Sequence, residues 1–188
     1  MLVLGDPDDP YLMNTAGGYY GMGGTPGRLY LVAWPSEDVI GRIAHCAVHG
    51  FHHNVRYADV AWHPMTVTVG EHVVAEGLAE AFVRELSGLE AMGPWSRVVT
   101  GAEFDRAYAK ILANLDLAGM RHTTAFVRGD TAARRFGQEP RGVPDMAGYG
   151  AGLRIVDAHP AATGLTVAES TVLSCEGILR NAGIRGGA

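Results

Sequence analysis

The stretch Ile43–Tyr57, which reads IAHCAVHGFHHNVRY, holds four of the eight histidines of this chain. It contains no Pro and its one Gly is internal, so the sequence predicts a helix here. With about 3.6 residues per turn, His45, His49 and His53 lie on one face of that helix, with Cys46 beside them. Two histidines at i and i+4 have the spacing that lets two imidazoles bind one metal ion.

The residue after the first histidine of this pair is unusual. The common motif is H-E-x-x-H, in which the Glu acts as general base, whereas this chain reads His49-Gly50-Phe51-His52-His53. Gly cannot accept or deliver a proton, and loss of a general acid–base group costs on the order of 10²–10⁴ in rate. The motif thus indicates a metal site. It indicates a catalytic site only if another group replaces the general base that is missing at position 50. A ligand, a larger metal shell or a neighbouring side chain could fill the space at Gly50.

A third ligand is predicted on the next helix, expected at about residues 71–86. There His72, Glu76 and Glu80 fall four residues apart and share one face. Glu76 opens the run E-G-L-A-E, in which the small residues Gly77 and Ala79 are expected to allow close approach to the first helix. Two His and one Glu form the ligand set of zinc sites that keep an open position. The same set also suits non-haem iron.

Several alternatives remain open around this group. Cys46 is either a fourth ligand, which would close the site, or a small buried hydrophobe. His45 could also approach the metal. A base other than residue 50 could be any of four side chains that the sequence does not rank: Glu80, His72, His122 and His159.

The pairing of H-x-x-x-H with a downstream E-G-L-A-E resembles a family of predicted zinc-dependent proteases that contain a domain of unknown function. These proteins are similar to gluzincins, which use H-E-x-x-H and a later Glu. The resemblance covers residues 28–182 and implies a zincin-like fold with His49, His53 and Glu76 as Zn²⁺ ligands. It also implies a base at position 50, which Gly50 does not supply.

Softer features support the same resemblance. One is a small strand before the first helix, a second is Arg56 just after the second histidine, and a third is the late G-Y-x-x-G sequence Gly148–Gly152. By analogy with gluzincins, Tyr149 is a candidate catalytic residue that would stabilise an oxyanion. The alternative is that Tyr149 is a packed aromatic side chain in a turn.

The rest of the chain predicts further helices and few strands. Strands are expected at 1–4 and 28–34, a Gly-rich loop at 16–27, and a helix from the Ser36 N-cap to about residues 57–59. A capping box at Thr100 and Glu103 predicts a third helix that Gly119 closes; residues 120–144 are expected to be rich in loops, and 147–158 helical. A capping box at Thr166 and Glu169 predicts a final helix with four core-facing residues: Ala168, Val172, Cys175 and Leu179.

Length and composition favour a single α+β domain over residues 1–188, mostly helical with a small N-terminal sheet. The chain is 47% hydrophobic and 19% charged, with a net charge of −5, which gives no general case for binding nucleic acid or an anionic membrane. The cluster Arg128, Arg134, Arg135 and Arg141 is read as an exposed loop rather than an anion site.

No secretory signal or apolar run of about 18 residues is present, so we expect a cytoplasmic protein whose two cysteines are thiols or ligands. Together these features predict a zinc-binding, metallopeptidase-like protein that lacks the usual general base, with a peptide or small molecule as its ligand in the metal cleft. The alternatives are a ligand-binding or sensor module and a metal-dependent tailoring enzyme of small-molecule metabolism. The sequence does not predict an oligomeric state.

Overall fold

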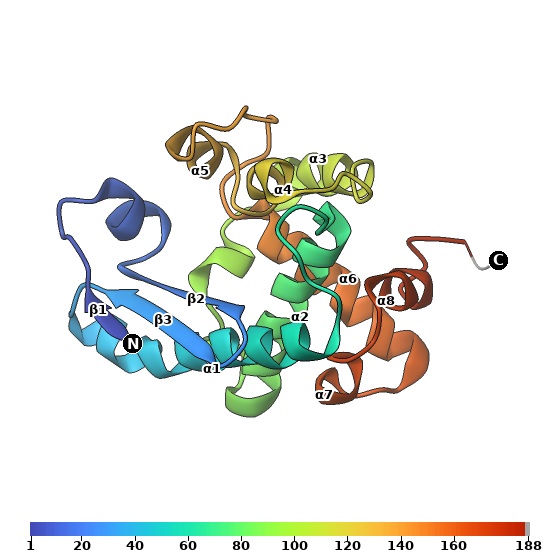
Figure 1. The fold of residues 1–188 in the computed structure, drawn as a ribbon, viewed down its shortest axis with the longest axis horizontal. Helices are drawn as coiled ribbons and strands as arrows, with labels where there is room; N and C mark the ends of the chain where they lie inside the picture. The colour runs from blue at the N-terminus through green and yellow to red at the C-terminus, as the bar shows by residue number, and fades with distance from the viewer. Residues whose placement is uncertain (187–188) are drawn as a thin grey trace.

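The computed structural model describes residues 1–186, so the last two residues of the expected domain 1–188 lie outside the described residues. The α+β class is as predicted: a small sheet near the N-terminus forms one side of the molecule, and helices form the rest (Figure 1). Within the described residues, no helix combines the length and the apolar character needed to cross a bilayer.

The sheet has three strands in the order β1-β3-β2: β1 (Leu2–Leu4), β2 (Tyr19–Thr25) and β3 (Arg28–Ala33). Strand β1 runs parallel to β3, and β2 forms an antiparallel hairpin with β3. The prediction of a loop at 16–27 was therefore wrong over most of its length. The glycines that suggested a loop instead permit close packing, because a Cβ on Gly23 would lie 2.2 Å from the carbonyl oxygen of Gly50.

Helix α1 (Glu37–Asp59) carries the histidine stripe and begins as predicted. The Ser36 hydroxyl accepts a hydrogen bond from the Val39 amide at 3.3 Å, and Glu37 and Asp38 lie at the positive end of the helix dipole. Strands β2 and β3 both pack against this helix. The sheet therefore covers the helix face that includes Gly50.

Helix α2 (Val69–Ser87) is buried over most of its length, up to Val83. Its closest partner is α6 (Ala147–Thr163), and the two helices meet at a pair of glycines. A Cβ on Gly77 would lie 2.2 Å from the carbonyl oxygen of Gly152. The expectation that Gly77 serves the contact with α1 is thus wrong, because this residue permits the approach of α6.

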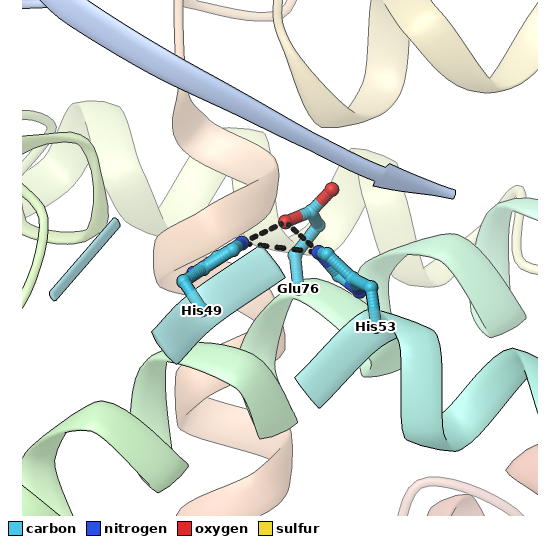
Figure 2. Close-up of side chains that lie close together, drawn as sticks. All are labelled: His49, His53 and Glu76. Atoms are coloured by element: carbon cyan, nitrogen blue, oxygen red, sulfur yellow. Dashed lines mark hydrogen bonds and ion pairs between the residues drawn. The ribbon is translucent and has the colours of Figure 1, made fainter. Parts of the chain in front are cut away.

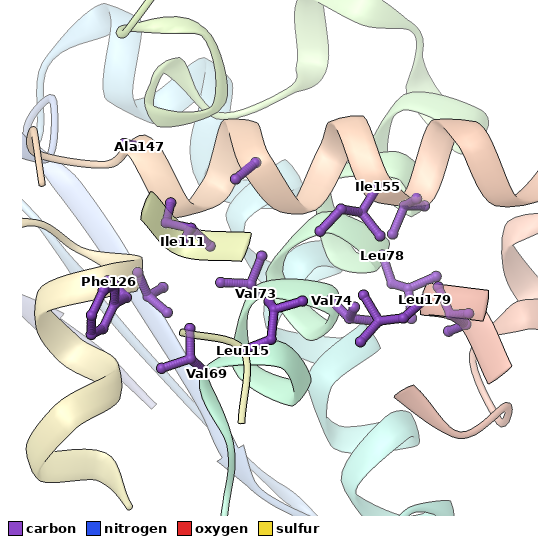
Figure 3. Packing of buried hydrophobic residues seen from close by; sticks show 14 of the residues in the cluster. Val69, Val73, Val74, Leu78, Ile111, Leu115, Phe126, Ala147, Ile155 and Leu179 are labelled. Carbon is purple, nitrogen blue, oxygen red and sulfur yellow. The ribbon is translucent and has the colours of Figure 1, made fainter. Parts of the chain in front are cut away.

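The main hydrophobic core surrounds α2 and draws on helices from the C-terminal half (Figure 3). Fully buried residues include Val73 and Leu78 on α2, Ile111 on α3 (Gly101–Leu112) and Ile155 on α6. Burial of such side chains contributes about 1.5–3 kcal/mol each. This core holds α2, and with it Glu76, in a fixed position relative to the rest of the fold.

Several predicted boundaries needed correction. Thr100 makes no capping bond, and α3 (Gly101–Leu112) ends before Gly119. The expected loop at 120–144 contains α4 (Met120–Val127) and α5 (Asp130–Arg135), which are too short to show a clear apolar period. The helix predicted at 147–158 continues past Pro160 and ends at Gly164, whose φ is +74°. Two short helices, η2 (Leu89–Ala91) and η3 (Pro94–Arg97), follow α2, and a π-helical turn, η1 (Tyr11–Thr15), precedes β2.

The predicted final helix is divided into α7 (Val167–Ser170) and α8 (Cys175–Asn181), and Ala168 and Val172, both predicted to face the core, are exposed. The Thr166 capping box is present as predicted. The break has a clear cause in Arg56, whose Nη1 donates to the carbonyl oxygens of Thr171 at 2.8 Å and Leu173 at 3.1 Å. The same buried side chain pairs with Glu71, so Arg56 ties α1 to α2 and to the α7–α8 connection.

Candidate metal centre

Three side chains from two helices converge at the centre of the molecule. His49 and His53 project from one face of α1, and Glu76 reaches them from α2 (Figure 2). The Glu76 Oε2 lies 3.0 Å from His49 Nε2 and 3.2 Å from His53 Nε2, and the two Nε2 atoms are 3.0 Å apart. All three residues are buried.

This geometry fits a metal ion. Tetrahedral zinc with bonds of about 2.0–2.1 Å to nitrogen and oxygen keeps its ligand atoms about 3.3 Å apart, close to the three separations in this group. Two imidazole nitrogens directed at each other next to one carboxylate oxygen also offer three electron pairs to a common point. His49, His53 and Glu76 could therefore hold one cation.

A second carboxylate fixes the orientation of His49. The Glu80 Oε1 lies 2.8 Å from His49 Nδ1, and this fully buried side chain also accepts hydrogen bonds from the Gly93 amide and the Trp95 indole. A carboxylate on Nδ1 leaves Nε2 free to bind a metal and raises its basicity. Glu80 thus supports a ligand and is not itself in the three-residue group.

The electrostatics of the group favour a positive charge at this point. Burial lowers the pKa of His49, but the Glu76 and Glu80 carboxylates outweigh burial and raise it to about 10. Burial likewise raises the pKa of Glu76, yet the neighbouring histidines hold it well below its usual value. Glu76 is therefore ionised at neutral pH, and either a proton or a metal ion can supply the charge that balances it.

The other residues of the stripe do not join the group. The Cys46 thiol lies outside the set of ligand atoms within 4.8 Å of one another in residues 1–186, and this residue packs with Tyr19, Val39 and Trp95 instead. The geometry therefore corrects the idea of Cys46 as a fourth ligand in favour of a buried hydrophobe. His45 is also outside the group, and His52 turns away to place its Nε2 3.1 Å from the Thr171 hydroxyl.

The space next to Gly50 is occupied by the sheet. A Cβ built on Gly50 would lie 2.3 Å from the Cδ1 atom of Leu29. Leu29 lies on β3, and the backbone of Gly23 on β2 approaches the same point. Of the three occupants considered for this space, a neighbouring side chain is the one found.

The four candidate bases can now be ranked by position. His72 lines a cavity beside the group, with its Nε2 3.5 Å from Glu76 Oε1 and its Nδ1 3.0 Å from the Thr123 hydroxyl. His159 is buried against Ser170, and His122 pairs with Arg121 at the surface. Only His72 and Glu80 are therefore near the group, and Glu80 is committed to His49.

Two cavities meet at the group. The metal-side cavity, about 500 Å³, is lined by His49, His53, His72 and Glu76, with β2 along one wall. The aromatic cavity, about 230 Å³, adjoins it at His49 and is lined mainly by aromatic and apolar side chains, among them Tyr11, Tyr20, Trp95, Phe136 and Met146. Both cavities share His49, Arg128 and Tyr149. A ligand could therefore contact the group from either side.

Tyr149 and Arg128 occupy this shared wall. The ring of Tyr149 lies 6.4 Å from that of His49 and 5.9 Å from that of Trp95, measured between centroids. Arg128 begins the segment after α4 and is half-buried, so its assignment to an exposed loop was wrong, whereas Arg134, Arg135 and Arg141 are exposed. Sequence reasoning missed that Arg128 and Trp95 reach the site, because both lie far from the histidine stripe along the chain.

An α+β fold with a buried His–His–Glu group defines a protein with a candidate metal centre. The chain matches the family described as predicted Zn-dependent protease (DUF2268) over residues 1–180, and it belongs to that family. The family description agrees with Zn²⁺ as the cofactor and with the resemblance noted from the motif.

One relative is the uncharacterized protein YjfC of Bacillus subtilis (strain 168), which is 34% identical over 176 residues. The match covers 94% of this chain and 59% of the relative, so the chain spans less than two thirds of the length of that protein. No solved structure matches the chain.

Proposed function

We propose that this protein is a metallopeptidase-like zinc protein in which His49, His53 and Glu76 hold the ion and which lacks the usual general base. The observation that supports it most is the convergence of the three ligand atoms within 3.2 Å of one another on two buried helices. Zinc would supply Lewis acidity for polarising a carbonyl group. Glu80 would keep His49 in the tautomer that can bind the ion.

The proposed loss of the base is supported by the surroundings of Gly50. Leu29 fills the space that a side chain at this position would need. Glu76 is the only carboxylate among the residues that line the two cavities. Because Glu76 is assigned to the ion, no carboxylate of the described chain is left there to move the proton of an attacking water. We therefore favour a non-proteolytic or repurposed member of the family.

Metal analysis of the purified protein tests the metal half of the proposal. We expect about one equivalent of zinc per chain and its loss in His49→Ala. His45→Ala is the matched control, because His45 lies on the same helix outside the group and its removal should leave the zinc content unchanged. One equivalent of zinc in His49→Ala would refute the assignment.

Peptide hydrolysis tests the catalytic half. The natural chain should show no zinc-dependent cleavage of a mixed peptide library above that of the His49→Ala variant. The double variant Leu29→Ala/Gly50→Glu restores a carboxylate and makes room for it, so cleavage is expected there. Gly50→Glu alone should be less active because Leu29 obstructs it. Robust zinc-dependent hydrolysis by the natural chain would refute the loss of the base.

The two cavities favour a ligand-binding or sensor module as the second candidate function. Such a module would keep the metal and use the cleft to hold a peptide or small molecule. Restored hydrolysis in the double variant would favour a degenerate peptidase. A ligand that co-purifies with the natural chain and is lost in His49→Ala would favour the module.

A further inference from the structure

Arg128 is the one partly or fully buried arginine of the described chain without a carboxylate partner. Three other arginines are withdrawn from solvent, and each pairs with an acidic side chain: Arg56 with Glu71, Arg84 with Asp157, and Arg185 with Asp116 and Glu176. Within residues 1–186, no carboxylate lies within 4.0 Å of the Arg128 guanidinium. An arginine partly withdrawn from water without such a partner is unfavourable, so its position calls for an explanation.

The position of Arg128 explains why it has no carboxylate partner within the chain, because this residue lines both cavities beside His49 and is open to a ligand there. Tyr149 lines both cavities with it, and Tyr149 and Glu76 both raise the pKa of Arg128 although burial opposes the shift. A planar guanidinium presents a fork of donors that matches two oxygens of one anion. A tyrosine hydroxyl alongside adds a further donor.

The surroundings select the kind of anion. The aromatic cavity contains one other arginine, Arg135, whose guanidinium is already bound by both carboxylate oxygens of Asp9. One unpaired cation among aromatic walls suits a single negative charge on an apolar body. A phosphate monoester carries about −1.5 to −2 at neutral pH and would be poorly balanced there.

We infer that Arg128, together with Tyr149, binds the carboxylate of a ligand whose apolar part enters the aromatic cavity. The inference deepens the proposed function, and it rests on that function for the placement of the ligand beside the metal. The metal-side cavity continues from the same wall along β2, which leaves room for a chain attached to the carboxylate-bearing residue. The carboxylate can therefore belong to the C-terminus of a peptide or to a free aromatic or branched acid.

Binding of matched acid and amide probes tests the inference. The probes are an N-acetylated tripeptide that ends in Phe with a free carboxylate, the same tripeptide as its C-terminal amide, and 4-phenylbutyrate as a small acid. Calorimetry on the zinc-loaded protein should show the acid tripeptide binding about 10- to 100-fold more tightly than the amide, as expected for a hydrogen bond between charged groups. Tighter binding of the tripeptide than of phenylbutyrate would assign the carboxylate to a peptide end, and the reverse would assign it to a small acid.

Arginine variants test whether Arg128 causes the preference for the acid over the amide. Arg128→Gln should abolish the preference for acid over amide, and Arg128→Lys should retain part of it, because Lys keeps the charge but loses the fork. Arg106→Gln, at an exposed position outside both cavities, is the matched control and should keep the full preference. Equal binding of acid and amide by the natural protein, no binding of any probe at millimolar concentration, or a preference that survives Arg128→Gln would overturn the inference. If Arg128→Gln fails to fold by circular dichroism, the natural protein and Arg128→Lys decide the question.

The same titrations on protein treated with a chelator separate this inference from the proposed function. A preference for the acid that persists without zinc, in a protein that proves to bind no zinc, would leave Arg128 as a carboxylate site and remove the metal proposal. Stoichiometric zinc with no preference for the acid would support the metal proposal and remove Arg128 as a carboxylate site.

Discussion

At the residue scale, the candidate centre depends on how two histidines of one helix are held. The Nδ1 atom of His49 is hydrogen-bonded to Glu80, which in turn accepts hydrogen bonds from the Gly93 amide and the Trp95 indole. The buried Nδ1 of His53 has no hydrogen-bond partner, and its ring stacks on Tyr57 instead. The two proposed ligands therefore differ in how their orientation is set, by a carboxylate for His49 and by ring stacking for His53.

The variant Glu80→Gln should weaken zinc binding without removing the ligands. A Gln can still accept one hydrogen bond, but it no longer carries the charge that raises the basicity of His49. Loss of such a partner typically costs about 10- to 100-fold in metal affinity, and we expect the dissociation constant for zinc to rise by that factor. Competition with a chromophoric chelator measures it. Glu90→Gln, at an exposed position, serves as the control, and equal affinities in the two variants would contradict the assigned role of Glu80.

The two thiols should be unreactive in the folded protein. Burial raises the pKa of Cys46 and of Cys175 to about 12, so at pH 8 the thiolate fraction is on the order of 10⁻⁴. A thiol reagent such as DTNB should label neither residue rapidly at pH 8 until denaturant is added. The unfolded thiols ionise at about 8.5, whereas the folded thiols stay protonated up to a higher pH. The burial of the two protonated thiols therefore contributes to the stability of the fold below pH 8.5, and this contribution falls as the pH rises towards 12. Rapid labelling of two thiols in the native state would show that the packing is wrong.

At the scale of elements, the site is made by helices α1 and α2, which the sequence predicts well. The sheet and the segment after α4 that holds Arg128 also contribute, and the sequence predicts these poorly. The Ser36 cap, the histidine stripe and the E-G-L-A-E run were enough to place α1, α2 and the candidate ligands, because these signals are local. Strand β2 was missed because its glycines serve close packing on α1, which is a tertiary requirement. Arg128 was missed for the same reason, since its burial depends on where α4 and α6 place it.

The glycine contact between α2 and α6 can be tested with a matched pair of substitutions. Gly77→Ala would push a methyl group against the backbone of Gly152, which cannot move as a side chain can. We expect a loss of roughly 1–3 kcal/mol in the free energy of unfolding, as for other overpacked cores. Gly41→Ala lies in α1 with no atom within 4 Å of the added methyl, and should stabilise by about 0.5–1 kcal/mol. Urea denaturation measures both, and similar effects of the two variants would contradict the close approach.

At the scale of the whole molecule, α1 is held to the helical core at two separate points. Near its C-terminal end, Arg56 joins α1 to Glu71 on α2 and to the α7–α8 connection. In its middle, His49 and His53 meet Glu76 and Glu80 of α2. The sheet packs on α1, and Tyr19 of β2 also contacts Trp95 of η3 directly. The proposed ion would therefore be a cross-link between the sheet-bearing helix and the core.

Zinc should consequently stabilise the whole fold. An ion that binds only the folded state, at about 1,000 times its dissociation constant, adds roughly 4 kcal/mol. For a chain of this size that corresponds to a rise in Tm of roughly 8–16 °C. Differential scanning calorimetry should show a single transition whose Tm rises when zinc is added and returns to its starting value when EDTA removes the zinc. The shift should be absent in His49→Ala and present in His45→Ala, whereas an equal shift in both variants would mean that zinc binds elsewhere and does not join α1 to α2.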